Sequence, residues 1–135
     1  MGRLLGLDYG RKRIGVAVTD DLRMIASPLD VYYNNQFLME NIKKICENYS
    51  IEMIVIGYPH SEKYLEAVRD VKKFSEKMKR EINIPIDYQN EEFSSVYMIS
   101  FLKSMGYNDK QIKEKIDKYA AQKILQDYLN RTKSV

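Results

Sequence analysis

Apolar residues recur along the chain with two different periods, and the order of these periods predicts a mixed α/β fold. Residues 3–8 and 13–19 are short stretches rich in Leu, Ile and Val, as in buried strands. The four residues between them include Gly10 and are typical of a hairpin, so we expect the two strands to run antiparallel. A third strand is expected around residues 24–33, and because it contains Pro28 it should lie at the rim of the sheet.

Beyond residue 35 the apolar residues take helical spacing, interrupted by two further strands. The spacing predicts helices over residues 36–49, 61–81, 94–105 and 109–130, and strands over residues 53–56 and 82–88. Asp109 is a candidate N-cap for the last helix. A helix followed by a buried strand implies a parallel crossover, so we expect one mixed sheet with helices on its faces. No repeat or linker marks a boundary, and residues 1–135 should form a single domain.

Composition and charge narrow the class of protein. With 44% hydrophobic and 30% charged residues, the composition is that of a globular protein. No apolar run approaches the roughly 20 residues that a membrane-spanning helix needs, and the first residues turn polar too soon for a signal peptide. We therefore expect a cytoplasmic protein with no membrane partner. The net charge of +3 does not by itself indicate a nucleic-acid-binding protein, but basic segments flank an acidic one at residues 81–100.

Asp8 is the first candidate for chemistry, because it ends a buried strand and is followed by Gly10 and the basic cluster Arg11-Lys12-Arg13. Alone, Asp-x-Gly after a strand is ordinary turn chemistry. The basic cluster changes the interpretation, since it could hold a phosphate backbone while the carboxylate holds a cation. Metal-assisted cleavage of a phosphodiester needs several carboxylates around one or two divalent ions, so further acids are required.

Glu91 and Asp117 are the further candidates. Glu91 follows the last predicted strand, and Asp117 lies beside the apolar stripe of the final helix, where a carboxylate could reach a strand end. Each has an ordinary alternative. The adjacent acids Glu91 and Glu92 could simply be solvated, and Asp117 could pair with Lys113 or Lys118 on its own helix.

Taken together, these segments resemble the YqgF-type family, whose members are described as pre-16S rRNA nucleases and as Holliday-junction-resolvase-like proteins. The resemblance covers nearly the whole chain and rests on residues 7–20 (LDYGRKRIGVAVTD), 26–29 (ASPL), 54–59 (IVIGYP) and 117–121 (DKYAA), followed by Ile124 and Leu125. It implies a ribonuclease-H-like fold with a five-stranded mixed sheet, the first three strands antiparallel, flanked by helices. It also implies catalytic and metal-binding roles for Asp8, Glu91 and Asp117, with Mg²⁺ or Mn²⁺ as the cofactor.

Two segments depart from the pattern of that family. The family's usual Asp-Glu-Arg after the last strand is replaced here by Asn90-Glu91-Glu92, which reverses the charge at one position. The loop that begins at His60 lacks the glycine that the family usually has. Altered specificity or weakened activity would be the consequence.

We therefore expect a metal-dependent endonuclease on structured nucleic acid, with processing of the 5′ end of pre-16S rRNA in ribosome maturation as the first choice. Arg11, Lys12 and Arg13 would bind the nucleic acid, and ribosomal precursor particles are a further candidate partner. Two alternatives remain open, a Holliday junction resolvase in DNA recombination and repair, and a non-catalytic RNA-binding ribosome maturation factor. Actin-like phosphotransferases also begin with Asp-x-Gly, but they need two such domains. The protein could be a monomer or a homodimer.

Overall fold

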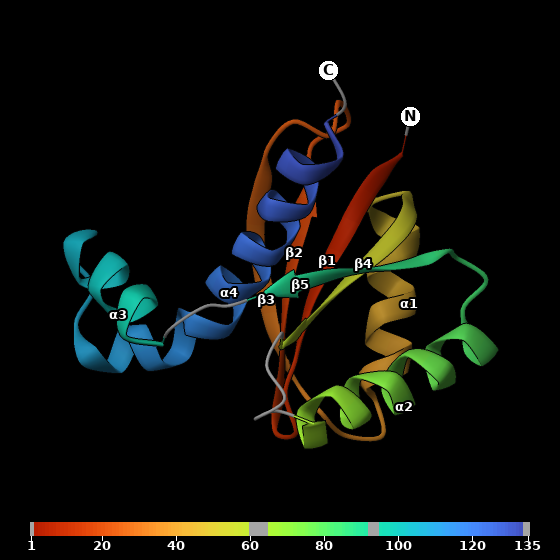
Figure 1. The fold of residues 1–135 in the computed structure, drawn as a ribbon, viewed down its shortest axis with the longest axis horizontal. Helices are drawn as coiled ribbons and strands as arrows, with labels where there is room; N and C mark the ends of the chain where they lie inside the picture. The colour runs from red at the N-terminus through yellow and green to blue at the C-terminus, as the bar shows by residue number, and fades with distance from the viewer. Residues whose placement is uncertain (1, 60–64, 92–94, 134–135) are drawn as a thin grey trace.

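Five strands form one mixed sheet in the computed structural model, which describes residues 2–59, 65–91 and 95–133. The strands are β1 (Arg3–Tyr9), β2 (Arg13–Thr19), β3 (Ala26–Tyr33), β4 (Ile51–Pro59) and β5 (Ile86–Glu91). Their order across the sheet is β3-β2-β1-β4-β5, with β1, β2 and β3 antiparallel and with β4 and β5 parallel to β1 (Figure 1). The predicted five-stranded mixed sheet is confirmed.

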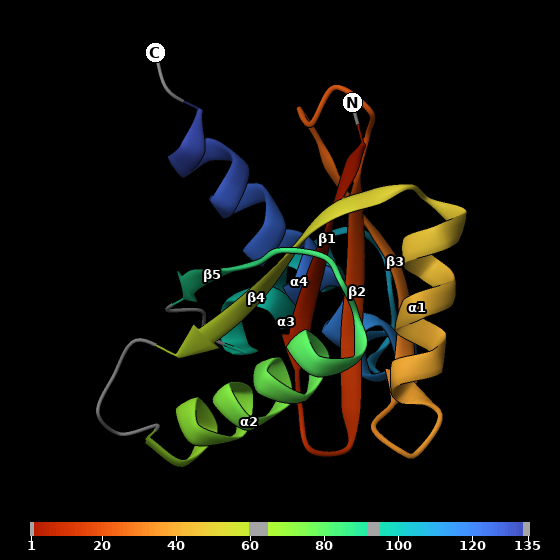
Figure 2. The same cartoon turned by 90° about the vertical axis from the view of Figure 1, so that its right-hand side faces the viewer.

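The helices divide between the two faces of this sheet. They are α1 (Leu38–Asn48), α2 (Leu65–Glu81), α3 (Ser95–Ser104) and α4 (Asp109–Thr132). Helices α1 and α2 cover one face and α4 crosses the other, while α3 packs against the first turns of α4 away from the sheet (Figures 1 and 2). None of the helices described has the length and apolar character that crossing a bilayer would require.

Alternation along β1 gives each face of the sheet its own core. Leu5 and Leu7 are fully buried under α1 and α2, whereas Leu4 packs with residues of α4. Gly6 also faces α4, since a Cβ built there would lie 2.8 Å from Cβ of Leu125. Successive side chains of a strand point to opposite faces, so the even-numbered residues of β1 form the row that meets α4.

Helix α4 docks directly on the sheet because glycines face it from three strands. A Cβ at Gly15 of β2 would lie only 1.8 Å from the main-chain oxygen of Asp117. At Gly57 of β4 the added Cβ would instead meet the end of a side chain, 2.3 Å from Cδ1 of Ile124. A contact with a helix main chain cannot be relieved by a rotamer change, so Gly15 fixes how closely α4 can approach.

The C-terminal half of α4 is tied to β5 by polar contacts. The hydroxyl of Tyr128 donates a 2.7 Å hydrogen bond to Asp87, which lowers the pKa of that carboxyl. Nε of Arg131 donates to the side-chain oxygen of Gln89 at 2.9 Å. These contacts hold the helix over the strand that ends at Glu91.

Several sequence predictions are confirmed and two are wrong. The first two strands do form an antiparallel hairpin, and Pro28 does lie in the edge strand β3, next to a register shift opposite Ala17. The last strand runs from Ile86 to Glu91 rather than over residues 82–88, because pairing with β4 begins only after Pro85. Residues 61–64 and 94 of the predicted helices lie outside the described residues.

The predicted N-cap of the last helix is also wrong. The cap is Asn108, whose side chain accepts a hydrogen bond from the main-chain N–H of Gln111, while the side chain of Gln111 accepts one from the N–H of Asn108. This reciprocal capping box satisfies two main-chain donors, which Asp109 could not do from one position later.

Replacing Gly15 with alanine tests whether the approach of α4 is set by main-chain contact. We expect Gly15→Ala to lower the free energy of unfolding by about 3 kcal/mol or more, at the upper end of overpacking effects. The matched change Gly57→Ala should cost about 1 kcal/mol, because only the end of the Ile124 side chain has to move. Urea unfolding of the two variants measures the difference, and equal losses would contradict this account of the docking.

Candidate active site

Asp8 and Asp117 meet where β1 ends under α4. Asp8 continues the row of Leu4 and Gly6, so its side chain is on the face that α4 covers. In the sheet Asp8 is paired with Gly15, the residue against which the main chain of Asp117 packs. The hairpin and the docked helix thus bring together two acids from opposite ends of the chain.

The electrostatics of Asp8 place Glu91 in the same cluster. The pKa of Asp8 is raised to about 7, chiefly by burial and then by the negative charges of Asp117 and Glu91. A carboxyl group shifted in this way by its neighbours lies within their electrostatic reach. Three acids from β1, β5 and α4 therefore share one environment at the C-terminal end of the parallel strands, the edge of an open α/β sheet at which ligands bind.

Glu91 is the most buried of the three acids. It is the last residue of β5, its side chain is only 4% exposed, and its Oε2 accepts a 3.2 Å hydrogen bond from Nζ of Lys123. Its other oxygen, Oε1, is buried and has no hydrogen-bond partner among the described residues. The pKa of Glu91 is raised to about 7, chiefly by burial and also by the carboxyl of Asp127, while Lys123 opposes the rise. Glu92, the neighbouring candidate, lies outside the described residues.

Asp117 is held by an arginine of the predicted basic cluster. Nε of Arg13 donates to its Oδ2 at 2.9 Å, so the ion pair joins α4 to β2 and does not involve Lys113 or Lys118. This ion pair fixes the side chain of Asp117 and places the positive charge of Arg13 at hydrogen-bond distance from its carboxylate.

The other two basic residues of the cluster differ from each other. Arg11 is turned toward α2, where it pairs with Glu66 at 2.6 Å and with Asp70 at 2.8 Å. Lys12 is exposed and makes no ion pair with any residue that the structure describes. Lys12 is therefore free to meet a phosphate, whereas Arg11 would have to leave its acidic partners.

The acids fit a divalent cation by charge and by donor type. Carboxylate oxygens are the ligands that Mg²⁺ and Mn²⁺ prefer. The unpartnered Oε1 of Glu91 and the raised pKa of Asp8 both mark negative charge that a cation would neutralise. As the side chains stand, no three acidic, histidine or cysteine side chains in the described ranges are grouped tightly enough to hold one ion. Oδ2 of Asp117 is paired with Arg13 instead, so the carboxylate of Asp117 would turn on loading.

Lys123 and Asp127 belong to this site and were missed from the sequence. Nζ of Lys123 lies 2.6 Å from Oδ2 of Asp127, four residues along the same helix, as well as 3.2 Å from Glu91. The i, i+4 spacing is visible in the sequence, but it is usually that of a solvated surface pair. Nothing local in the sequence connects this pair to Glu91.

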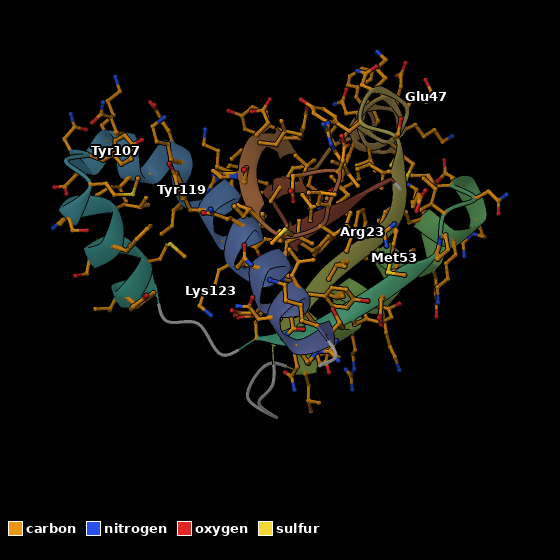
Figure 3. The ribbon with its side chains drawn as sticks, turned by 90° about the horizontal axis from the view of Figure 1, so that it is seen from above. Arg23, Glu47, Met53, Tyr107, Tyr119 and Lys123 are labelled. Carbon is orange, nitrogen blue, oxygen red and sulfur yellow. The ribbon has the colours of Figure 1, made fainter. Side chains whose placement is uncertain are left out.

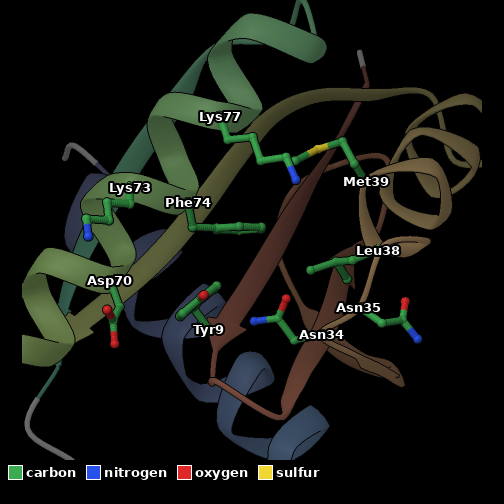
Figure 4. A pocket seen from close by; sticks show the side chains of 9 residues that line it. All are labelled: Tyr9, Asn34, Asn35, Leu38, Met39, Asp70, Lys73, Phe74 and Lys77. Atoms are coloured by element: carbon green, nitrogen blue, oxygen red, sulfur yellow. The ribbon is translucent and has the colours of Figure 1, made fainter.

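A pocket of about 230 Å³ lies on the opposite face of the sheet, beside Tyr9 (Figure 4). Its lining combines apolar, amide and charged side chains from β1, α1, α2 and the loop before α1: Tyr9, Asn34, Asn35, Leu38, Met39, Asp70, Lys73, Phe74 and Lys77. Since Asp8 and Tyr9 are consecutive in a strand, they face opposite sides of the sheet. The pocket is therefore separate from the acid cluster.

Comparison with known proteins agrees with this arrangement. A family model described as "RuvX: Holliday junction resolvase" matches residues 2–131. The chain is 42% identical, over 97% of its length and 92% of the relative's, to a protein of Sulfurihydrogenibium sp. named "Putative pre-16S rRNA nuclease". A protein of the same name from Phocaeicola vulgatus is 35% identical over the full length of both chains.

The solved structures with a similar fold include two that contain Holliday junction DNA. A structure of T. thermophilus RuvC in complex with a Holliday junction substrate superposes with a TM-score of 0.59 at 12% identity, covering 97% of this chain and 95% of that one. The fowlpox virus resolvase with Holliday junction DNA gives 0.57 at 10% identity, covering 98% and 99%. At these identities the likeness concerns the fold alone, and it agrees with the ribonuclease-H-like fold expected from the sequence.

The raised pKa of Asp8 predicts that this residue destabilises the metal-free protein. The pKa of its carboxyl is 3.8 in the unfolded chain and about 7 in the folded protein. The loss of stability caused by its charge is therefore absent below pH 3.8 and complete above about pH 7. Asp8→Asn should therefore raise the free energy of unfolding by about 2–4 kcal/mol at about pH 8, and by little at about pH 4. Urea unfolding with a chelator present measures this.

Asp109→Asn is the matched control, since it makes the same change at a side chain of α4 that is 93% exposed. It should leave the free energy of unfolding nearly unchanged across the same pH range. A stabilisation by Asp8→Asn that was equal at both ends of the range would contradict the assignment of the shift to Asp8.

Proposed function

Because this chain belongs to the RuvX family, described as Holliday junction resolvases, we propose that it is a nuclease that hydrolyses phosphodiester bonds in structured nucleic acid. The observation that carries the proposal is the cluster of Asp8, Glu91 and Asp117, drawn from three elements to the end of the parallel strands. Its substrate, we propose, is pre-16S rRNA, which the names of its relatives mention, and the cut would fall at the 5′ end.

Each acid has a role that follows from its position. Asp8, Glu91 and Asp117 would hold a divalent cation, Mg²⁺ or Mn²⁺, which when bound supplies an activated water and stabilises the leaving oxygen. Asp8 is fixed by the sheet, so it defines where the scissile phosphate must lie. Glu91 contributes from a buried strand end, and its Oε1, which has no partner in the part of the chain that the structure describes, is the oxygen available for this purpose.

The basic residues next to the acids would position the nucleic acid. Lys12, at the tip of the hairpin, is exposed and would neutralise a phosphate of the backbone. Arg13 would exchange Asp117 for a phosphate oxygen as the cation takes over the carboxylate. Arg11 would act at the outer end of the same path, in exchange for Glu66 and Asp70.

A Holliday junction is the second candidate substrate, favoured by the description of the family model. Both candidates are structured nucleic acids that present closely spaced phosphates, and the acid cluster would act on either in the same way. Ribosomal precursor particles would be the partner in the first case only. The two substrates therefore have to be compared in one experiment.

The proposal predicts that Asp8→Asn abolishes cleavage while the protein stays folded. A labelled 5′-extended pre-16S rRNA fragment and a labelled four-way DNA junction are each incubated with the protein and Mg²⁺ or Mn²⁺. We expect a loss of at least about 100-fold in rate, because the loss of a metal ligand should exceed the 10- to 100-fold effect of altering an outer-shell contact. Asp109→Asn, the same change at an exposed position, should cut at the wild-type rate.

The results separate the alternatives. Cleavage of one substrate and not the other identifies the substrate class. Tight binding of pre-rRNA with no metal-dependent cleavage by the wild-type protein would favour a non-catalytic maturation factor. An Asp8→Asn variant that cuts at the wild-type rate would refute the assignment of the acids.

A further inference from the structure

Lys123 projects from α4 (Figure 3). Its ammonium group contacts two carboxylates, those of Glu91 and Asp127. Its Nζ is 3.2 Å from Oε2 of Glu91 and 2.6 Å from Oδ2 of Asp127, and the side chain is 31% exposed. Glu91 is almost completely buried, so this ammonium group is a charged partner that the fold supplies to it. A buried carboxylate without such a partner would be strongly unfavourable.

The two oxygens of Glu91 are in different situations. Oε2 is occupied by Lys123, whereas Oε1 is buried and unpartnered within the described part of the chain. The charge of Glu91 also acts on Asp8. One side of Glu91 is thus already neutralised by a resident cation, and the other is available for a cation shared with Asp8.

Sites that use two divalent ions hold them about 4 Å apart, with a carboxylate commonly placed between them. Here Glu91 belongs to two groups of acids: its charge and that of Asp117 both act on Asp8, and it shares Lys123 with Asp127. The second group contains the ammonium group of Lys123, within hydrogen-bond distance of both acids that would otherwise coordinate an ion there.

We propose that Lys123 is the resident cation at the position between Glu91 and Asp127, and that the site therefore takes one divalent ion rather than two. The inference rests on the proposed function, since it assumes that Asp8, Asp117 and Glu91 hold a metal. In it Lys123 is a positioning residue, which fixes Oε2 of Glu91 and leaves Oε1 for the single ion. Asp127 in turn holds Lys123 in place.

Counting bound Mn²⁺ in the absence of nucleic acid tests the proposal. Mn²⁺ is titrated into the full chain, and free ion is measured by electron paramagnetic resonance alongside calorimetry. Wild type should bind one ion per chain. Lys123→Met, which keeps the length of the side chain but not the charge, should bind a second ion at least about tenfold more tightly than wild type does.

Two further variants serve as controls. Lys123→Arg retains a cation between the two acids and should still bind one ion. In the double variant Lys123→Met with Asp127→Asn, the second set of ligands is incomplete, so the second ion should be lost again. Circular dichroism checks that each variant is folded, and Lys123→Gln replaces Lys123→Met if the methionine variant does not fold.

The outcomes distinguish this inference from the proposed function. Two ions bound by wild type, or unchanged stoichiometry and affinity in folded Lys123→Met and Lys123→Gln, would overturn the role of Lys123 and leave the nuclease assignment intact. A wild-type protein that binds no Mn²⁺ and cuts neither substrate would overturn the proposed function itself.

Discussion

The contact on which the rest of the site depends is the one between the main chain of α4 at Asp117 and Gly15 of β2. Because no side chain fits at Gly15, the helix lies directly on the sheet. Asp8 is paired with Gly15 across the hairpin, so the same contact places Asp117 over Asp8. A helix held one side chain further away would move Asp117 away from Asp8. The role of Gly15 is therefore to set the spacing of the acids.

This close approach concentrates negative charge, and the fold balances it with cations from two directions. Arg13 reaches Asp117 from β2, and Lys123 reaches Glu91 from α4. Without these two cations the cluster would hold several unpaired carboxylates in a partly buried place, which would strongly destabilise the fold. An excess of negative charge remains, and together with burial it raises the pKa of Asp8 and of Glu91. A divalent cation held by these acids would relieve that excess of negative charge.

The sequence predicts those features that local pattern determines. Alternation and turn chemistry identify the hairpin, Pro28 marks an edge strand, and the acids at the strand ends follow from the element order. The start of β5 and the cap at Asn108 were misplaced because each depends on geometry beyond periodicity: pairing with β4 in one case, a reciprocal bond to Gln111 in the other. The links from Arg13 to Asp117 and from Lys123 to Glu91 could not be predicted, since they join residues far apart in the chain.

The position of Lys123 also bears on the departure at Asn90-Glu91-Glu92. In the family pattern an arginine follows the glutamate, whereas here Glu92 stands in its place and adds negative charge to the segment. The buried carboxylate of Glu91 nevertheless has a cation within hydrogen-bond distance, and that cation comes from α4 rather than from the end of the strand. The charge of Glu91 is therefore balanced from the helix that the glycines admit and does not depend on a cation from its own strand. This balance requires that α4 stay docked, so it depends in turn on the contact at Gly15.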